Sequence, residues 1–146
     1  MVDQSVTIYI DYKSPYAYLA LEPTWTLSRD YEITLKWLPY TLDIPDYLGS
    51  AKVDSQGKVL EATRSPHQWR KVRYSYMDVR RYANLRGLTV RGPQKIWDSS
   101  LAAIGLLYAQ KQGKFRDYND KVYELFWRRE LDIEDPLVIK SVLTET

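Results

Sequence analysis

Two short runs in the first forty residues have the hydrophobic pattern of β-strands. Val6–Ile10 is a short, mainly apolar run between polar residues, which is consistent with a strand buried on both faces. Glu32–Leu38 alternates between polar and apolar residues and is rich in β-formers, so it predicts a second strand, which Pro39 ends. A connecting helix would make this a βαβ unit with parallel strands and a right-handed crossover.

The segment between the two strands predicts that helix. Ser14 is a good N-cap, and Pro15 suits the first helical position because its missing N–H would have no partner there. The helical pattern continues to about Arg29. Because Pro23 lies inside it, we expect a kink or a restart near Leu21.

The rest of the chain combines one irregular stretch with a series of helices. Tyr40–Ser65 contains several turn-forming pieces and predicts a long loop, of the kind that is often functional or mobile. Apolar residues then recur at three- and four-residue steps over Pro66–Arg86, from residue 98 or 99 to Gly113, and over Phe115–Arg129. The second of these is apolar on most sides and is expected at the centre of a bundle. A last helix should end near Leu143.

Composition excludes several classes of chemistry. The 146 residues suit one domain, at 45% apolar and 27% charged residues. There is no cysteine, so disulfides, thiolate metal sites and dithiol redox chemistry are excluded, and a single histidine, His67, excludes a histidine-rich metal site. No secretory signal or bilayer-spanning run is visible, so we expect a cytoplasmic location and no membrane partner.

Basic residues gather in one part of the chain. Between Arg64 and Lys95 there are nine Lys or Arg residues and one acid, Asp78, whereas the net charge of the whole chain is only +2. This stretch is interpreted in three ways: a wall that attracts carboxylates, a solvated helix face, or a nucleic-acid surface. We do not favour nucleic acid, because a dedicated domain of that kind usually carries a larger net charge.

The hinge between the first strand and helix carries a family resemblance. Asp11-Tyr-Lys-Ser14-Pro15-Tyr16-Ala-Tyr18 resembles the start of the DsbA-like thioredoxin superfamily, in the branch of the kappa-class glutathione transferases and 2-hydroxychromene-2-carboxylate isomerases. Redox members place Cys-x-x-Cys where this chain has Ser14 to Ala17. Further along the chain, the resemblance is carried by Pro66, Arg70, Lys71, Tyr74, Asp78, Arg81 and the segment Tyr123–Trp127.

This resemblance implies an α/β fold, with a thioredoxin-like βαβ unit in residues 1–40 and an inserted helical part in residues 62–143. The C-terminal ββα half of that fold, which begins with a cis-proline strand, is missing from the single domain of residues 1–146. Without it the first strand would have an open edge, which is an aggregation hazard. Three outcomes are open: a fragment of a longer chain, a homodimer that covers this edge, or a drifted fold in which helices cover the sheet. We favour the first two.

The resemblance also implies the site. Ser14 would be the catalytic residue and would hold the thiolate of glutathione, with Tyr16, Lys71 and Asp78 as further glutathione contacts. Residues expected to contact the substrate are Tyr12, Arg70, Tyr74 and Arg81. The residues alone leave plainer interpretations open: Ser14 as an N-cap only, Lys71 as a solvated side chain, and Asp78 as the partner of Arg81.

The implied function is a glutathione-dependent isomerase or transferase-like enzyme that acts on an aromatic or unsaturated carboxylate and needs no metal. The thiolate would add to an activated double bond, allow rotation, and leave again. The alternative is a non-catalytic domain of the same fold that binds an anionic ligand or a partner.

Overall fold

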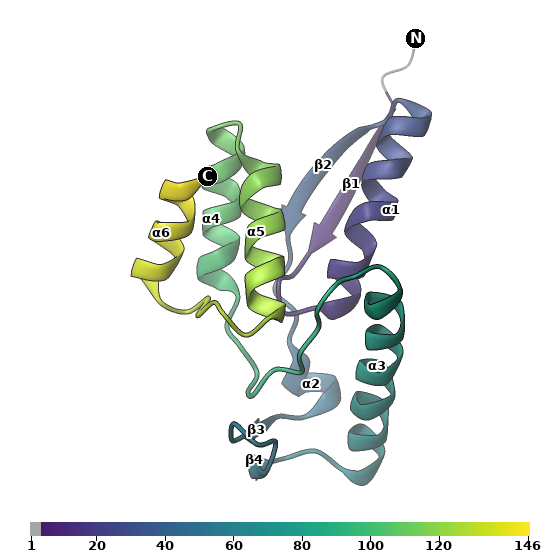
Figure 1. Cartoon of the computed structure of the whole chain (residues 1–146), viewed down its shortest axis with the longest axis vertical. Helices are drawn as coiled ribbons and strands as arrows, with labels where there is room; N and C mark the ends of the chain where they lie inside the picture. Colours follow the sequence, from purple (N-terminus) through teal and green to yellow (C-terminus); the bar gives the residue numbers. More distant parts are fainter. Residues whose placement is uncertain (1–3) are drawn as a thin grey trace.

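A computed structural model describes residues 4–146, in which the chain forms two small sheets and a series of helices (Figure 1). The strands are β1 (Ser5–Ile10), β2 (Thr34–Pro39), β3 (Ala51–Val53) and β4 (Val59–Ala62). The helices are α1 (Pro15–Tyr31), α2 (Ile44–Leu48), α3 (Pro66–Leu85), α4 (Ser100–Lys111), α5 (Phe115–Trp127) and α6 (Pro136–Glu145). Within these residues, no helix combines the length and the apolar character needed to cross a membrane.

The first three elements form the expected βαβ unit. Strands β1 and β2 are parallel, with a continuous register from Ser5 opposite Thr34 to Ile10 opposite Pro39. Helix α1 connects them and lies beside both strands (Figure 1). The two strands therefore end at the same edge, next to the N-terminus of α1.

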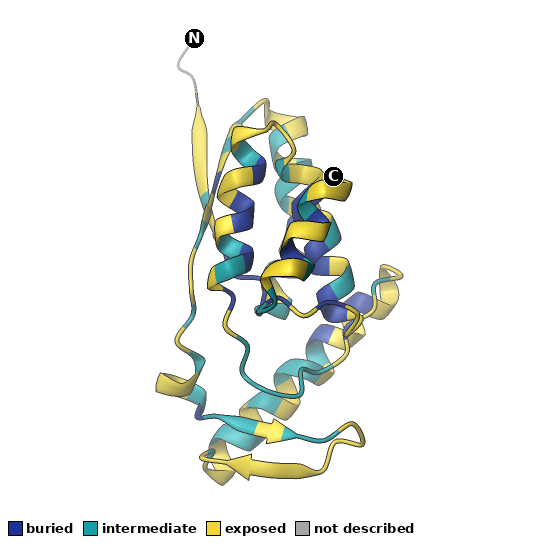
Figure 2. Ribbon diagram, turned by 90° about the vertical axis from the view of Figure 1, so that its left-hand side faces the viewer, coloured by how far each residue is buried: buried dark blue, intermediate teal, exposed yellow. Residues whose placement is uncertain are grey.

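Strand β1 is not buried on both faces, so that prediction is wrong. Tyr9 is 63% exposed and Val6 is 39% exposed, and only Ile10 of this strand is buried (Figure 2). Successive side chains point to opposite faces of a strand, and here only the face with Ile10 reaches the core. An apolar run predicts a strand, but it does not tell whether both faces are covered.

Helix α1 continues through Pro23 without the expected restart. A proline cannot donate to the carbonyl four residues earlier, which here belongs to Leu19. That carbonyl instead accepts two hydrogen bonds from the Arg86 guanidinium, from Nη1 and Nη2, both at 2.8 Å. A side chain from the end of α3 thus replaces the missing backbone donor and ties α1 to α3.

The stretch Tyr40–Ser65, predicted as irregular, contains helix α2 and a hairpin. Strands β3 and β4 pair antiparallel, with Ala51 opposite Ala62. The hairpin is attached to a later loop by a hydrogen bond from the Val53 N–H to the Gln94 carbonyl, at 2.8 Å. The prediction missed these elements because a five-residue helix and strands of three and four residues are too short to show a period.

The core lies mainly among the C-terminal helices. Helix α4 lies between α5 and α6, as expected for the central helix of a bundle (Figure 1), and Leu106 on it is fully buried. Not all of its apolar side chains are buried, since Ile104 is 63% exposed. The buried residues gather along the facing sides of these helices (Figure 2). The observed helix ends differ from the predicted ones by a few residues at most.

Candidate functional site

Ser14 stands at the hinge between β1 and α1 and caps the helix. Its Oγ accepts a hydrogen bond from the Ala17 N–H at 3.2 Å, and its own N–H donates to the Asp11 carbonyl at 3.0 Å. The first turn of α1 has no acidic side chain, so the positive end of the helix dipole is not neutralised there. Since the hydroxyl acts as acceptor in the cap, its proton remains available to a ligand.

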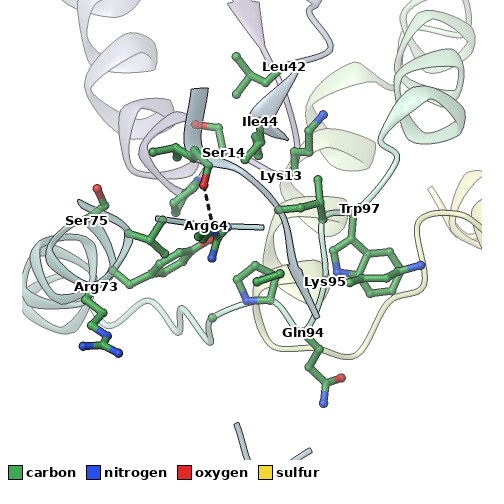
Figure 3. A pocket seen from close by; sticks show the side chains of 18 of the residues that line it. Lys13, Ser14, Leu42, Ile44, Arg64, Arg73, Ser75, Gln94, Lys95 and Trp97 are labelled. Atoms are coloured by element: carbon green, nitrogen blue, oxygen red, sulfur yellow. Dashed lines mark hydrogen bonds between the residues drawn. The ribbon is translucent and has the colours of Figure 1, made fainter. Parts of the chain in front are cut away.

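Ser14 also lines a pocket of about 450 Å³. Five parts of the chain surround this pocket: the N-terminus of α1, the α2 segment, strand β3, one face of α3 with Arg64 just before it, and the loop of residues 92–97 (Figure 3). Its walls are mostly apolar and aromatic. The basic residues that line it are Lys13, Arg64, Arg73, Arg80 and Lys95, and no acidic residue among residues 4–146 lines it. This composition favours an anion with an apolar body.

Two of these basic residues already have acidic partners. The Lys13 ammonium lies 2.7 Å from Asp11 Oδ2 and also donates to Ser99 Oγ at 3.2 Å, and both members of the pair are buried. Lys95 lies 2.6 Å from Glu134 and stacks over the ring of Trp97. Lys13 and Lys95 therefore build the wall of the pocket rather than offer free charge to a ligand.

Three of the predicted residues meet at the edge of the pocket. The Tyr16 hydroxyl donates to Asp78 Oδ2 at 2.8 Å, and Arg81 Nη2 donates to Asp78 Oδ1 at 2.6 Å. The hydrogen bond from Tyr16, followed by that from Arg81, lowers the pKa of the Asp78 carboxyl below its ordinary value. Tyr16 lines the pocket, whereas Asp78 and Arg81 do not line it and contact it only through Tyr16.

Replacing Tyr16 by phenylalanine should therefore raise the pKa of Asp78 toward its ordinary 3.8. Because folding depresses this pKa, the stabilisation by Asp78 is present at neutral pH and is lost as the pH falls below that value. The variant should lose less stability on acidification than the wild type. A carboxyl-detected NMR titration measures the shift, and an unchanged pKa in the variant would contradict the assignment.

The other predicted contacts lie outside the pocket. Tyr12 is only 1% exposed and packs in the core against Tyr118 and Tyr123. Arg70, Lys71 and Tyr74 are exposed on α3, but on a face that does not line the pocket; the α3 residues that line it are Trp69, Val72, Arg73, Ser75, Tyr76 and Arg80. Sequence reasoning included Arg73 and Arg80 in the basic stretch but did not single them out as site residues, although the apolar steps of the helix indicated this face.

Sequence reasoning gave no role to Lys13, and it included Arg64 only as a member of the basic stretch between Arg64 and Lys95. The Asp11-x-Lys13 spacing directly after a strand is a local signal that could have suggested the buried ion pair. Arg64 has no comparable signal, because its place depends on α2 packing against the start of α3. Among residues 4–146, no group of three or more His, Cys, Asp or Glu side chains is arranged to hold a metal ion.

Comparisons with known proteins give two findings. The family model described as a DSBA-like thioredoxin domain matches residues 5–146. A solved structure of 2-hydroxychromene-2-carboxylate isomerase is similar with a TM-score of 0.63 and 20% sequence identity, over 97% of this chain and 71% of that chain. At this identity the likeness shows the fold. A comparison with curated proteins gave no significant match.

Proposed function

The chain belongs to the DSBA-like thioredoxin domain family, and from this premise we propose that it is a glutathione-dependent isomerase or transferase-like enzyme that acts on an aromatic or unsaturated carboxylate. The similar structure of 2-hydroxychromene-2-carboxylate isomerase supports an enzyme of this fold. With it we propose a cytoplasmic location, and a homodimer in which a second copy covers the exposed side of β1.

The observation that carries this proposal is the position of Ser14. Its hydroxyl stands at the N-terminus of α1 and on the wall of the pocket, and its proton is not used by the helix cap. A hydroxyl donor and the helix dipole both stabilise an anion placed at this point. When bound, glutathione would supply a thiolate that adds reversibly to a double bond conjugated with a carbonyl.

The chain's other residues would bind and orient the ligands. The free basic side chains of the pocket are proposed to attract the carboxylates, and the aromatic wall to hold the unsaturated part of the substrate. Tyr16, Asp78 and Arg81 would form one edge of the site. Three predicted contacts lie outside the pocket lining, and a ligand would have to extend out of the pocket to reach them: Arg70, Lys71 and Tyr74. The buried side chain of Tyr12 is left out of the proposed contacts.

The proposal is tested with variants of Ser14 that separate the helix cap from the donor. Alanine loses both, aspartate keeps a good cap but donates no proton, and threonine keeps both. Removing one donor to a developing anion typically lowers turnover about 10²-fold or more. We expect that loss, and a higher thiol pKa of bound glutathione, for Ser14→Ala and Ser14→Asp, with most of the activity retained in Ser14→Thr. Thiolate absorbance and glutathione-dependent double-bond isomerisation of a cis-enone carboxylate are the measurements.

A second candidate is a non-catalytic domain that binds an anionic ligand or partner. It is favoured by the basic lining of the pocket, to which no acidic side chain of the described part of the chain contributes. Such a lining would attract anions with or without catalysis. Millimolar glutathione should raise the melting temperature under the first proposal, because a ligand stabilises the state that binds it. A flat response, together with equal behaviour of the three Ser14 variants, would overturn the first proposal in favour of the second.

A further inference from the structure

Arg64 differs from Lys13 and Lys95, which line the same pocket, because it has no carboxylate partner among the described residues. It is half-buried, and its guanidinium lies 5.0 Å from the ring centroid of Trp69. Lys13 and Lys95 line the same pocket and each pair with a carboxylate. Within residues 4–146, no acidic side chain forms an ion pair with Arg64. Burial lowers the pKa of its guanidinium from the ordinary value, although an arginine still remains charged.

Most donors of this guanidinium have no protein acceptor. An arginine head group carries five N–H donors. Within the described residues, its Nε alone forms a hydrogen bond, to the Leu48 carbonyl at 3.1 Å. The two terminal nitrogens are left for a ligand or for water. Figure 3 shows the Arg64 head group among the lining side chains, whereas the Arg73 guanidinium points outward from α3.

The position of Arg64 is fixed by its neighbours. Gly49, at the end of α2, has a φ of 65°, and a Cβ there would lie 3.1 Å from both Cα and Cγ of Arg64. The close approach of Gly49 allows the α2 segment to pack on Arg64 and to accept its Nε–H. The Gln68 side chain adds a second link, because its Nε2 donates to the Tyr47 carbonyl at 3.4 Å. An arginine held through Nε presents both terminal nitrogens in one plane, which suits a carboxylate.

We propose that Arg64 is the residue that anchors a carboxylate of the ligand, through its two terminal nitrogens, beside the apolar wall of the pocket. The inference rests on the proposed function for the class of ligand, an unsaturated carboxylate used with glutathione. The carboxylate could belong to the substrate or to glutathione itself. The chemistry of recognition is the same, and the experiment separates the two sources.

The test compares an acid with its neutral analogue. Cinnamate and cinnamamide are titrated into the wild type and into Arg64→Met, with binding followed by tryptophan fluorescence and calorimetry. We expect the wild type to prefer the acid, and Arg64→Met to lose about tenfold to a hundredfold in affinity for the acid, as for a charged hydrogen-bonded pair. The affinity for the amide should change less than twofold. Arg29→Met, which removes an exposed arginine paired with Asp30, is the matched control and should change neither.

Two further variants separate anchoring from folding. Arg64→Lys keeps the charge but not the paired donors, so its affinity should fall between those of the wild type and Arg64→Met. Gly49→Ala keeps the arginine but shifts its side chain, because the added Cβ would lie 3.1 Å from Cα and Cγ of Arg64. It should lower the affinity for the acid and leave the affinity for the amide unchanged. Equal loss of acid and amide in Arg64→Met would assign Arg64 a structural role only and overturn the proposal, as would a wild type that binds the acid no better than the amide.

A glutathione titration of the same proteins identifies the source of the carboxylate. A loss confined to cinnamate assigns Arg64 to the substrate, and a loss for glutathione as well assigns it to a carboxylate that both ligands present there. If glutathione does not bind at all, but cinnamate still binds through Arg64, the proposed function fails and this inference stands. A loss confined to glutathione assigns Arg64 to a carboxylate of glutathione. If glutathione binds at Ser14 but Arg64→Met weakens neither glutathione nor cinnamate, the proposed function stands and this inference fails.

Discussion

Replacing Asp11 by alanine is expected to destabilise the fold by about 3–5 kcal/mol, because the buried Lys13 ammonium is left without a counter-ion. The side chains of Asp11 and Lys13 are 2% and 5% exposed, so solvent cannot compensate. The same carboxylate also accepts the backbone N–H of Leu42 at 2.7 Å and that of Lys13 at 3.1 Å. Chemical denaturation, with the free energy extrapolated to water, measures the loss.

A double-mutant comparison shows whether the buried charge is the cause. Asp11→Asn removes the negative charge and keeps one side-chain oxygen, which can accept from only one of the two oxygen positions that Lys13 N–H and Leu42 N–H now use. Adding Lys13→Met to it should recover part of the lost stability, because the uncompensated ammonium is then gone. Asp30→Ala, which breaks an exposed pair with Arg29, should cost less than about 0.5 kcal/mol. A loss below about 1 kcal/mol for Asp11→Ala would contradict the expected role of the pair.

The same residue supports the candidate site through its backbone. The Asp11 carbonyl accepts the Ser14 N–H at 3.0 Å and the Tyr123 hydroxyl at 3.2 Å. The Asp11 side chain holds Lys13, which lines the pocket, and its Leu42 contact holds the segment that leads to α2. One buried residue thus joins the end of β1 to the hinge at Ser14 through its carbonyl, and to Lys13 and the opposite wall of the pocket through its carboxylate. We expect Asp11→Asn to weaken ligand binding even where it folds.

The parts of the fold with strong local signals were predictable. Ser14 and Pro15 mark the start of α1, and the structure has the cap and the helix there. The apolar steps of α3 and α5 gave helices with nearly the right ends. The failures concern tertiary context. The exposure of Tyr9 depends on what covers the sheet, and the passage of α1 through Pro23 depends on Arg86, which is 67 residues from the carbonyl it binds.

The candidate site was predictable at its hinge but not along α3. Ser14 and Tyr16 line the pocket as expected, because they follow directly from the strand-to-helix turn. On α3, a pattern borrowed from the resembled family pointed to Lys71 and Tyr74, which lie outside the pocket lining. Successive residues of a helix are about 100° apart, so a neighbouring face of the same helix presents different side chains from those that line the pocket. The position of Arg64 required the fold of α2, which the sequence pattern did not reveal.

Gly105→Ala is the second substitution with a large expected effect, because α4 and Tyr118 of α5 meet at this position. A Cβ on residue 105 would lie 2.2 Å from the Tyr118 hydroxyl oxygen and 2.8 Å from its Cζ. Tyr118 is fully buried and donates to the Ala102 carbonyl at 2.7 Å, so its ring has little room to move. Overpacking of this kind costs about 1–3 kcal/mol, and an unsatisfied buried hydroxyl costs about as much again.

Helix propensity acts in the opposite direction, since alanine is favoured over glycine inside a helix by about 1 kcal/mol. We therefore expect a net loss of about 2 kcal/mol or more in the free energy of unfolding. In a Tyr118→Phe background the nearest atom is absent, so Gly105→Ala should cost less there than in the wild type. A stabilising effect of Gly105→Ala would mean that α4 and α5 are packed less closely. The Tyr118 ring also packs edge-on against Tyr12, with 6.2 Å between the ring centroids, and Tyr12 precedes Lys13 and Ser14 in the chain. Looser packing at Gly105 would therefore imply looser packing beneath the hinge at Ser14.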